Sequence, residues 1–149
     1  MVDNATEGIG HVWQITRGAS FREFSNLATG SGLRLYQSHA PSDEYRQLFY
    51  DTAGGNWQLK GLDGSVEHFR SDGQWLKTVL PTDTAHPTQG TYNPSGQLTR
   101  VDFPDGRSED YTYSAGKLLT ITENAVGGAA VRTWSYTWTG RSPRHHPSP

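Results

Sequence analysis

Short runs in which apolar and polar side chains alternate recur along most of the chain. In residues 131–138, for example, the aromatic side chains of Trp134, Tyr136 and Trp138 alternate with polar ones. A period of two predicts a β-strand with one apolar face. Between residues 50 and 138, no segment keeps a helical period free of glycine or proline for three turns. The pattern therefore predicts an all-β protein.

An aromatic residue followed four positions later by glycine recurs at regular intervals. The pairs are Tyr50 with Gly54, Phe69 with Gly73, Tyr92 with Gly96 and Tyr136 with Gly140, and Tyr113 precedes Gly116 by one residue fewer. Successive aromatic positions are 19, 23, 21 and 23 residues apart. This spacing indicates tandem repeats of about twenty residues, each too small to bury an apolar face alone.

Each repeat is predicted to form two short strands and two turns. The strands after the glycines are expected at residues 74–79, 97–101 and 117–121, and the return strands at 65–69, 109–113 and 131–138. Asp63-Gly64 and Asp105-Gly106 are predicted hairpin turns, because glycine readily takes a positive φ. Leu98 is expected on the apolar face, and the repeat that begins at Phe69 has an extra residue at Trp75-Leu76. The predicted fold is a meandering antiparallel sheet.

Two segments resemble a known family most closely. Tyr50-Asp51-Thr52-Ala53-Gly54 contains a literal Tyr-Asp pair, and residues 92–101 followed by Pro104-Asp105-Gly106 reproduce nearly a whole repeat. These units resemble the YD repeats of the bacterial RHS (rearrangement hotspot) family, over residues 50 to about 140. The resemblance implies tandem YD-type β-hairpin repeats that form part of the wall of a hollow RHS β-cocoon.

Three parts are predicted along the chain. Residues 1–49 form an N-terminal β segment with strands at 11–16 and 33–36, and residues 50–140 hold repeats that begin near 50, 69, 92, 113 and 136. Residues 141–149 are a tail of proline, histidine, arginine and serine, in which three prolines prevent pairing inside a sheet. One interpretation of the tail is disorder. The other is a shift of reading frame after Gly140, which would make the chain a truncated fragment.

Composition narrows the possible functions. The chain has 149 residues, a formal net charge of −2 and no cysteine, which excludes disulfides, a cysteine zinc site and a thiol nucleophile. No apolar run is long enough to span a membrane, and the charge offers no electrostatic attraction to nucleic acid. Residues 1–10 lack the apolar core of a signal peptide.

No arrangement of residues predicts catalysis, a metal or a cofactor. The sequence has no nucleophile-elbow pattern and no glycine-rich loop that opens a helix. Asp102, Asp105, Glu109 and Asp110 lack the order of a calcium loop and are better explained by turn chemistry. His68, beside Glu67 on a return strand, is expected to face solvent. The resemblance also supplies no catalytic residue, so we expect a protein that is not an enzyme.

Two functions remain open. The resemblance implies a structural segment of an RHS shell that encapsulates a C-terminal toxin, with the remaining repeats or the toxin cargo of a longer protein as partners. The alternative is an extracellular carbohydrate-binding module, in which exposed aromatic rings stack on sugars. The candidate rings are Trp57, Trp75, Trp134 and Trp138, although aromatic rings at a two-residue period more usually pack against the neighbouring sheet face. The family implies a secreted or cell-surface location.

Overall fold

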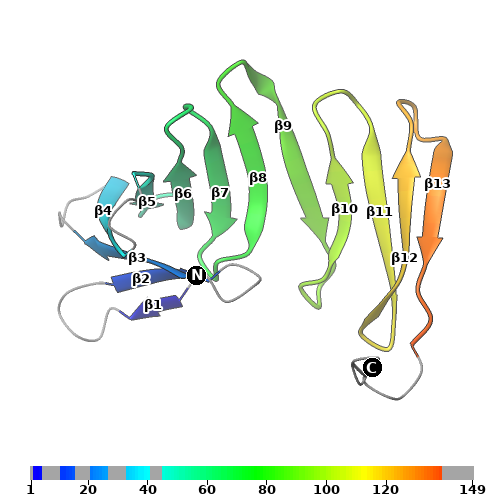
Figure 1. Cartoon of the computed structure of the whole chain (residues 1–149), viewed down its shortest axis with the longest axis horizontal. Helices are drawn as coiled ribbons and strands as arrows, with labels where there is room; N and C mark the ends of the chain where they lie inside the picture. The colour runs from blue at the N-terminus through cyan, green and yellow to red at the C-terminus, as the bar shows by residue number, and fades with distance from the viewer. Residues whose placement is uncertain (1, 5–10, 16–20, 27–32, 41–44, 139–149) are drawn as a thin grey trace, which may run out of the picture. The chain divides into compact units, whose positions relative to one another are not determined.

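The computed structural model describes residues 2–4, 11–15, 21–26, 33–40 and 45–138 (Figure 1). These residues form thirteen β-strands and, within the same ranges, no helix. Hydrogen-bonded neighbours follow chain order from the first strand to the last, so the predicted all-β meander is confirmed. By its internal contacts the chain divides into two compact units, unit 1 (Met1–Gly90) and unit 2 (Thr91–Pro149).

Unit 1 contains eight complete strands and most of a ninth. They are β1 (Val2–Asn4), β2 (His11–Ile15), β3 (Phe21–Asn26), β4 (Leu33–Ala40), β5 (Gln47–Asp51), β6 (Asn56–Lys60), β7 (Val66–Arg70), β8 (Trp75–Leu80) and β9 (Asp83–Tyr92). The predicted strands at 11–16 and 33–36 are present as β2 and β4. Five further strands lie outside the ranges predicted from the sequence, namely β1, β3, β5, β6 and β9.

A buried hydrophobic cluster on one face of the sheet holds unit 1 together. Its members, the core cluster, are Phe24, Tyr36, Leu48, Trp57, Leu59 and Phe69. Leu48 and Leu59 lie directly opposite each other on β5 and β6 and are 0% and 1% exposed. A flat single sheet would leave this face open to water, so such low exposure requires the sheet to curl over the cluster. Figure 1 shows β2 and β3 lying across the direction of β6 and β7.

Unit 2 consists of the end of β9 and four further strands. These are β10 (Leu98–Asp102), β11 (Ser108–Ser114), β12 (Lys117–Asn124) and β13 (Ala130–Ser135). Its one buried hydrophobic side chain among the described residues is Val101, which is 8% exposed. Leu98 is only half-buried and lies three positions before Val101. Since successive side chains of a strand point to opposite faces, Leu98 lies on the face of Arg100 and away from Val101. The expectation that it lies on the apolar face was wrong.

Five turns share one hydrogen-bonding pattern. The first backbone N–H donates to the carbonyl oxygen of the fifth residue, and the glycine in fourth place donates to the first carbonyl oxygen. The turns are 61–65, 70–74, 93–97, 103–107 and 125–129. Their fourth-place glycines have φ between 76° and 89°. The predicted turns at Asp63-Gly64 and Asp105-Gly106 are thus confirmed, as three-residue loops with a bulged glycine.

A shorter turn explains the irregular spacing of the repeat at Tyr113. Ser114 and Lys117 pair directly across Ala115 and Gly116, which have φ of 48° and 78°. Two positive φ values define a two-residue type I′ hairpin. This loop is one residue shorter than the others, so Gly116 follows the aromatic residue one position early.

The extra residue in the repeat at Phe69 forms a β-bulge. Phe69 pairs with Trp75, whereas the preceding His68 pairs with Lys77, so Leu76 has no partner of its own on β7. The predicted irregularity at Trp75-Leu76 is therefore present at that place. The predicted division at residues 49 and 140 stays a prediction. The two compact units are divided after Gly90. The predicted tail at 141–149 lies outside the described residues.

Candidate functional site

Two of the four candidate tryptophans belong to the interior of unit 1. Trp57 is 2% exposed, and its ring centroid lies 4.5 Å from that of Tyr50 and 5.3 Å from that of Tyr36. Its indole N–H donates to the carbonyl oxygen of Ser71 at 3.3 Å. With its faces covered in this way, Trp57 offers no surface on which a sugar ring can stack.

Trp75 is half-buried beside the same cluster. Its ring packs against the core cluster, and its indole N–H donates to the hydroxyl of Thr78 at 3.1 Å. Because it lies opposite Phe69 across β7 and β8, Trp75 extends the apolar face of the sheet. Packing explains its position, as it does that of Trp57.

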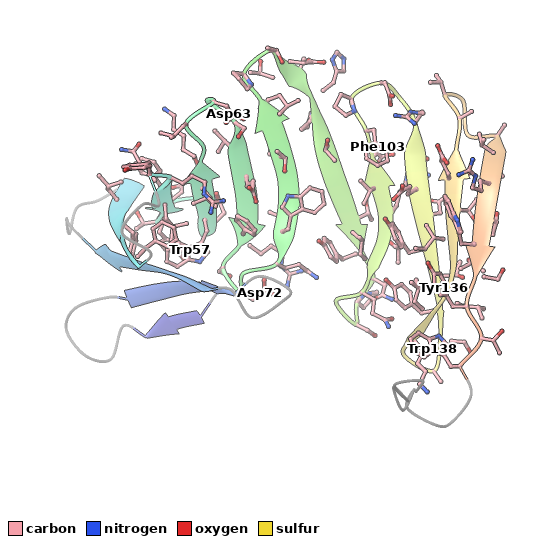
Figure 2. All side chains as sticks on the ribbon, in the orientation of Figure 1. Trp57, Asp63, Asp72, Phe103, Tyr136 and Trp138 are labelled. Carbon is pink, nitrogen blue, oxygen red and sulfur yellow. The ribbon has the colours of Figure 1, made fainter. Side chains whose placement is uncertain are left out.

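The other two candidates are exposed at the last strand. Trp134 is 39% exposed and Trp138 is 57% exposed, with Tyr136 between them at 40%. These three rings, the edge aromatics, lie at every second position, with Trp134 on β13 and Tyr136 and Trp138 just after it. Figure 2 shows Tyr136 and Trp138 near the ends of β12 and β13. Both tryptophan rings are therefore accessible to solvent.

A cation accompanies each exposed tryptophan. The guanidinium of Arg132 lies 5.4 Å from the ring centre of Trp134, and the ammonium of Lys117 lies 5.6 Å from that of Trp138. These distances fit cation–π attraction. The indole N–H of Trp138 also donates to the carbonyl oxygen of Leu118 at 2.6 Å, so this ring is held in place although it is exposed.

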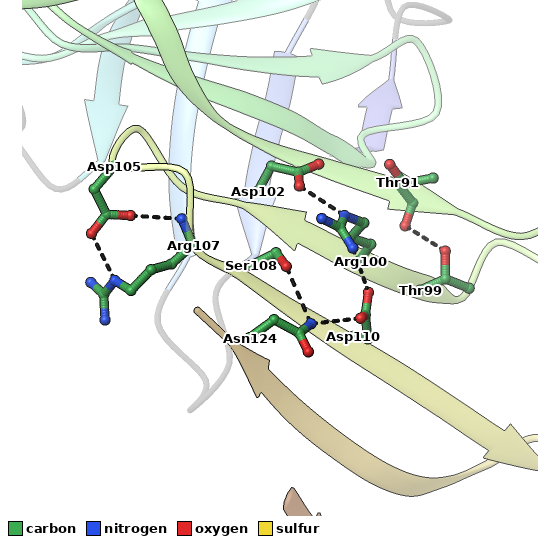
Figure 3. Close-up of polar contacts among 9 residues, drawn as sticks. All are labelled: Thr91, Thr99, Arg100, Asp102, Asp105, Arg107, Ser108, Asp110 and Asn124. Carbon is green, nitrogen blue, oxygen red and sulfur yellow. Dashed lines mark hydrogen bonds and ion pairs between the residues drawn. The ribbon is translucent and has the colours of Figure 1, made fainter. Parts of the chain in front are cut away.

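A polar network on β10, β11 and β12, the Arg100 network, was not anticipated from the sequence (Figure 3). Arg100 donates to Asp102 at 2.7 Å and to Asp110 at 3.1 Å. Asn124 donates to the other oxygen of Asp110 at 2.6 Å and to the hydroxyl of Ser108 at 3.2 Å. Hydrogen bonding to Asp102 and the two nearby carboxylates raise the pKa of Arg100. The network explains how Ser108 and Asn124 can be buried, at 2% and 5% exposure.

The remaining acids of this region are also bound by hydrogen-bond donors. Asp105 accepts the backbone N–H and the guanidinium of Arg107, and these interactions lower its pKa. Glu109 accepts the hydroxyl of Tyr111 at 2.5 Å, and burial together with that carboxylate raises the pKa of Tyr111. Among the described residues no group of three or more potential ligands is arranged to hold a metal ion. Each acid of the cluster therefore has a structural role.

These features define the class of protein: a tandem array of antiparallel β-hairpins joined by glycine turns. Residues 92–130 match the family model described as RHS Repeat. The match confirms the resemblance to the RHS/YD-repeat family over strands β10 to β12. The curated proteins gave no match, and neither did the solved structures.

In the RHS family such repeats have a structural role. RHS-repeat proteins are typically extracellular or located at the cell surface, and an RHS repeat ordinarily adjoins other repeats of a longer protein. Within the described residues, no helix has the length and apolar character needed to cross a membrane.

Proposed function

We propose that this chain is a non-enzymatic segment of the wall of a longer RHS protein, which encloses a C-terminal toxin. Its partners are then the neighbouring repeats and the toxin cargo, and its location is outside the cell or at the cell surface. The single observation that supports this proposal best is the position of β13, which among the described residues is an edge strand that pairs with β12 on one side only. All six residues of that strand are exposed, and a wall grows by addition of strands at such an edge.

The backbone geometry shows which groups of β13 are available for pairing. The backbone N–H of Tyr136 donates to the carbonyl oxygen of Leu119 on β12 at 2.8 Å. In an antiparallel pair, alternate residues direct both backbone groups to the same side. Trp134 therefore faces β12 as Tyr136 does, whereas Thr133 and Ser135 direct their N–H and C=O groups away from it. Such a row of outward-facing groups is a template for another strand.

Substitution of Thr133 tests whether this edge associates. Proline at 133 removes one outward N–H and is tolerated on an edge strand, whereas valine at 133 removes only the hydroxyl that contacts Thr122 at 3.2 Å. We expect sedimentation velocity to show association of the unmodified chain and of Thr133→Val as concentration rises. Thr133→Pro should remain monomeric. A wild-type chain that is monomeric throughout the concentration series would count against a wall segment.

A second candidate function is recognition of extracellular glycans. The exposed rings of Trp134 and Trp138 and their adjacent cations support it. Affinity electrophoresis in gels that contain polysaccharide should then show retardation that is lost in Trp134→Ala and Trp138→Ala. Tyr45→Ala is a suitable control, because Tyr45 is 68% exposed and belongs to unit 1. Equal mobility of all four proteins in every gel would contradict glycan binding at the edge aromatics.

A further inference from the structure

A row of polar side chains crosses the face of unit 1 that lies opposite the core cluster. Direct cross-strand pairing aligns Gln58 on β6 with His68 on β7, and His68 with Lys77 on β8. Gln58 also pairs with Phe49 on β5, next to the buried Leu48. Since adjacent residues of one strand point to opposite faces, this row lies away from the core cluster. The expectation that His68 and Glu67 form a solvent-facing pair was wrong, because they occupy opposite faces and His68 is half-buried.

A pocket lies on this row, the β6–β8 pocket. Its volume is about 430 Å³, and the side chains that line it include Asn56, Gln58, His68, Arg70, Leu76 and Lys77. Leu76 is the unpaired residue of the β-bulge. Bulges locally break the ladder and redirect a side chain, and they are common beside functional sites. The extra residue in this repeat therefore contributes directly to the wall of the pocket.

The lining of the β6–β8 pocket favours a negatively charged ligand. It includes two cations and two amides, and no carboxylate. Arg70 forms an ion pair with Asp72 outside the lining, whereas Lys77 has no ion-pair partner among the described residues. Hydrogen bonds between a charged donor and a charged acceptor are stronger than neutral ones. Lys77 is therefore the principal anchor. Gln58 donates to the side-chain oxygen of Asn56 at 3.5 Å, and the remaining amide groups of these two side chains can contact a polar body attached to the anion.

From this geometry we infer that the β6–β8 pocket binds the carboxylate of a small polar ligand, with Lys77 and Arg70 at the charged group. The lining combines the apolar side chain of Leu76 with the amides of Asn56 and Gln58. This combination suits a ligand ring that has both polar and apolar surfaces. A second pocket of about 240 Å³, lined by Phe49, Gln58, Lys60 and Val66, shares Gln58 with the first. The inference stands independently of the proposed wall and of the edge aromatics.

His68 makes this binding sensitive to pH. Burial and the positive charge of Lys77 lower the pKa of His68, which favours the neutral ring. The groups that face it are Gln58 from β6, Lys77 from β8 and, from its own strand, Arg70 with its partner Asp72. A bound carboxylate favours the protonated ring and raises this pKa. By linkage, affinity for the anion increases as the pH falls through the range in which His68 titrates.

Titration of the intact chain with glucuronate, followed by the NMR signals of the His68 ring, tests the inference. We expect a saturable shift and an increased His68 pKa, and no effect from glucose, which has a similar ring without a carboxylate. A parallel titration with acetate, which has a carboxylate but no ring, tests whether the ring of glucuronate contributes to its affinity. Equal affinity means that any carboxylate is recognised, and tighter binding of glucuronate means that the ring contributes; either result supports the inference.

Variants provide a second readout. Lys77→Met keeps the side-chain stem and removes the charge, so we expect glucuronate affinity to fall about tenfold or more. Lys117→Met removes a lysine beside Trp138 in unit 2 and should leave affinity unchanged. The inference fails if neither anion shifts His68, if glucose acts as glucuronate does, or if folded Lys77→Met binds as well as the unmodified chain. The titration of the unmodified chain decides the matter if Lys77→Met does not fold.

Discussion

The two units solve the same structural problem with different side chains. Unit 1 buries six hydrophobic side chains in one cluster that spans β3 to β7. Unit 2 buries Val101, and its other buried side chains among the described residues are the polar Ser108 and Asn124. The segment that matches the RHS Repeat model, residues 92–130, lies wholly in unit 2. The most regular repeat of the chain is therefore found where the hydrophobic interior is smallest.

This difference shows what the repeat pattern specifies. The glycine turns and cross-strand ladders are local and occur in both units. A hydrophobic interior instead requires curvature, and the curled sheet of unit 1 covers its own apolar face. In unit 2 the Arg100 network and the threonine pairs Thr112–Thr120 and Thr122–Thr133 connect neighbouring strands. Such cross-strand pairs contribute only about 0.2–1 kcal/mol each. Unit 2 therefore depends for its stability on many pairs between its own strands, whereas unit 1 has a buried hydrophobic cluster.

The largest expected effect is a difference in the free energy of unfolding between matched leucine-to-alanine variants of the two units. Leu48→Ala removes a side chain with no exposed surface, and we expect a loss of about 2–5 kcal/mol in the free energy of unfolding. Leu119→Ala makes the same chemical change at a residue that is 43% exposed and should cost less than about 1 kcal/mol. Urea unfolding followed by tryptophan fluorescence measures both. Equal losses would show that the core cluster does not dominate the stability of the chain.

A second pair of variants tests which face of β10 is apolar. Val101→Asp places a carboxylate at a buried position, which we expect to cost about 3 kcal/mol. Leu98→Asp places it on the face of Arg100, at a half-buried site, and the cost should be about 1 kcal/mol. Circular dichroism during thermal unfolding compares the two. A larger loss in Leu98→Asp would restore the face assignment suggested by the sequence alone.

Acid should weaken the turns of both units. Ser65 hydrogen bonds lower the pKa of Asp63, the Gln74 backbone N–H lowers that of Asp72, and Arg107 lowers that of Asp105. A carboxyl whose pKa is lower in the folded state stabilises the fold at a pH above its unfolded value, near 3.8. This stabilisation is lost as the pH falls through the folded-state pKa.

Melting temperatures measured between pH 7 and pH 2 test this dependence. The triple variant Asp63→Asn, Asp72→Asn and Asp105→Asn has no carboxylate at these turns to take up a proton as the pH falls. We expect its melting temperature to fall less steeply below about pH 4 than that of the unmodified chain. Superimposable pH profiles would mean that other groups control acid unfolding.

Turns and strands were predictable because their causes are local. Glycine at the fourth turn position and aspartate before it specify Asp63-Gly64 and Asp105-Gly106 within five residues. The extra residue at Trp75-Leu76 could be found in the sequence by counting the length of the repeat. Its consequence, the β6–β8 pocket, is apparent only from the register of the three strands. Counting back from the 61–65 turn pairs Gln58 with His68, but counting from the 70–74 turn pairs His68 with Leu76. The alignment of Lys77 with His68 depends on the bulge, so it was not predictable from the turns alone.

Burial was not predictable from residue type. Trp57 and Trp138 are the same residue in similar repeats, yet one is 2% and the other 57% exposed. What differs is the position of each strand, since β6 lies inside the curled sheet of unit 1 and Trp138 follows the last strand of unit 2. The error at Leu98 had another cause: residues 98 and 101 differ by an odd number, so both cannot face the same side of a regular strand.

The smallest expected effect concerns the one turn that departs from the shared pattern. Ala115 has a φ of 48°, in the left-handed region, and is the one described non-glycine residue with a positive φ. The left-handed conformation costs an alanine about 1–2 kcal/mol, and asparagine adopts it more readily. Asn-Gly is also the preferred pair of type I′ hairpins. We expect Ala115→Asn to raise the free energy of unfolding by about 0.5–1 kcal/mol.

Ala53→Asn, in an exposed turn without a positive φ at that residue, should give no such gain. If Ala115→Asn is neutral or destabilising by urea unfolding, the two-residue loop is not the native conformation, and the repeat at Tyr113 would need the longer loop found elsewhere.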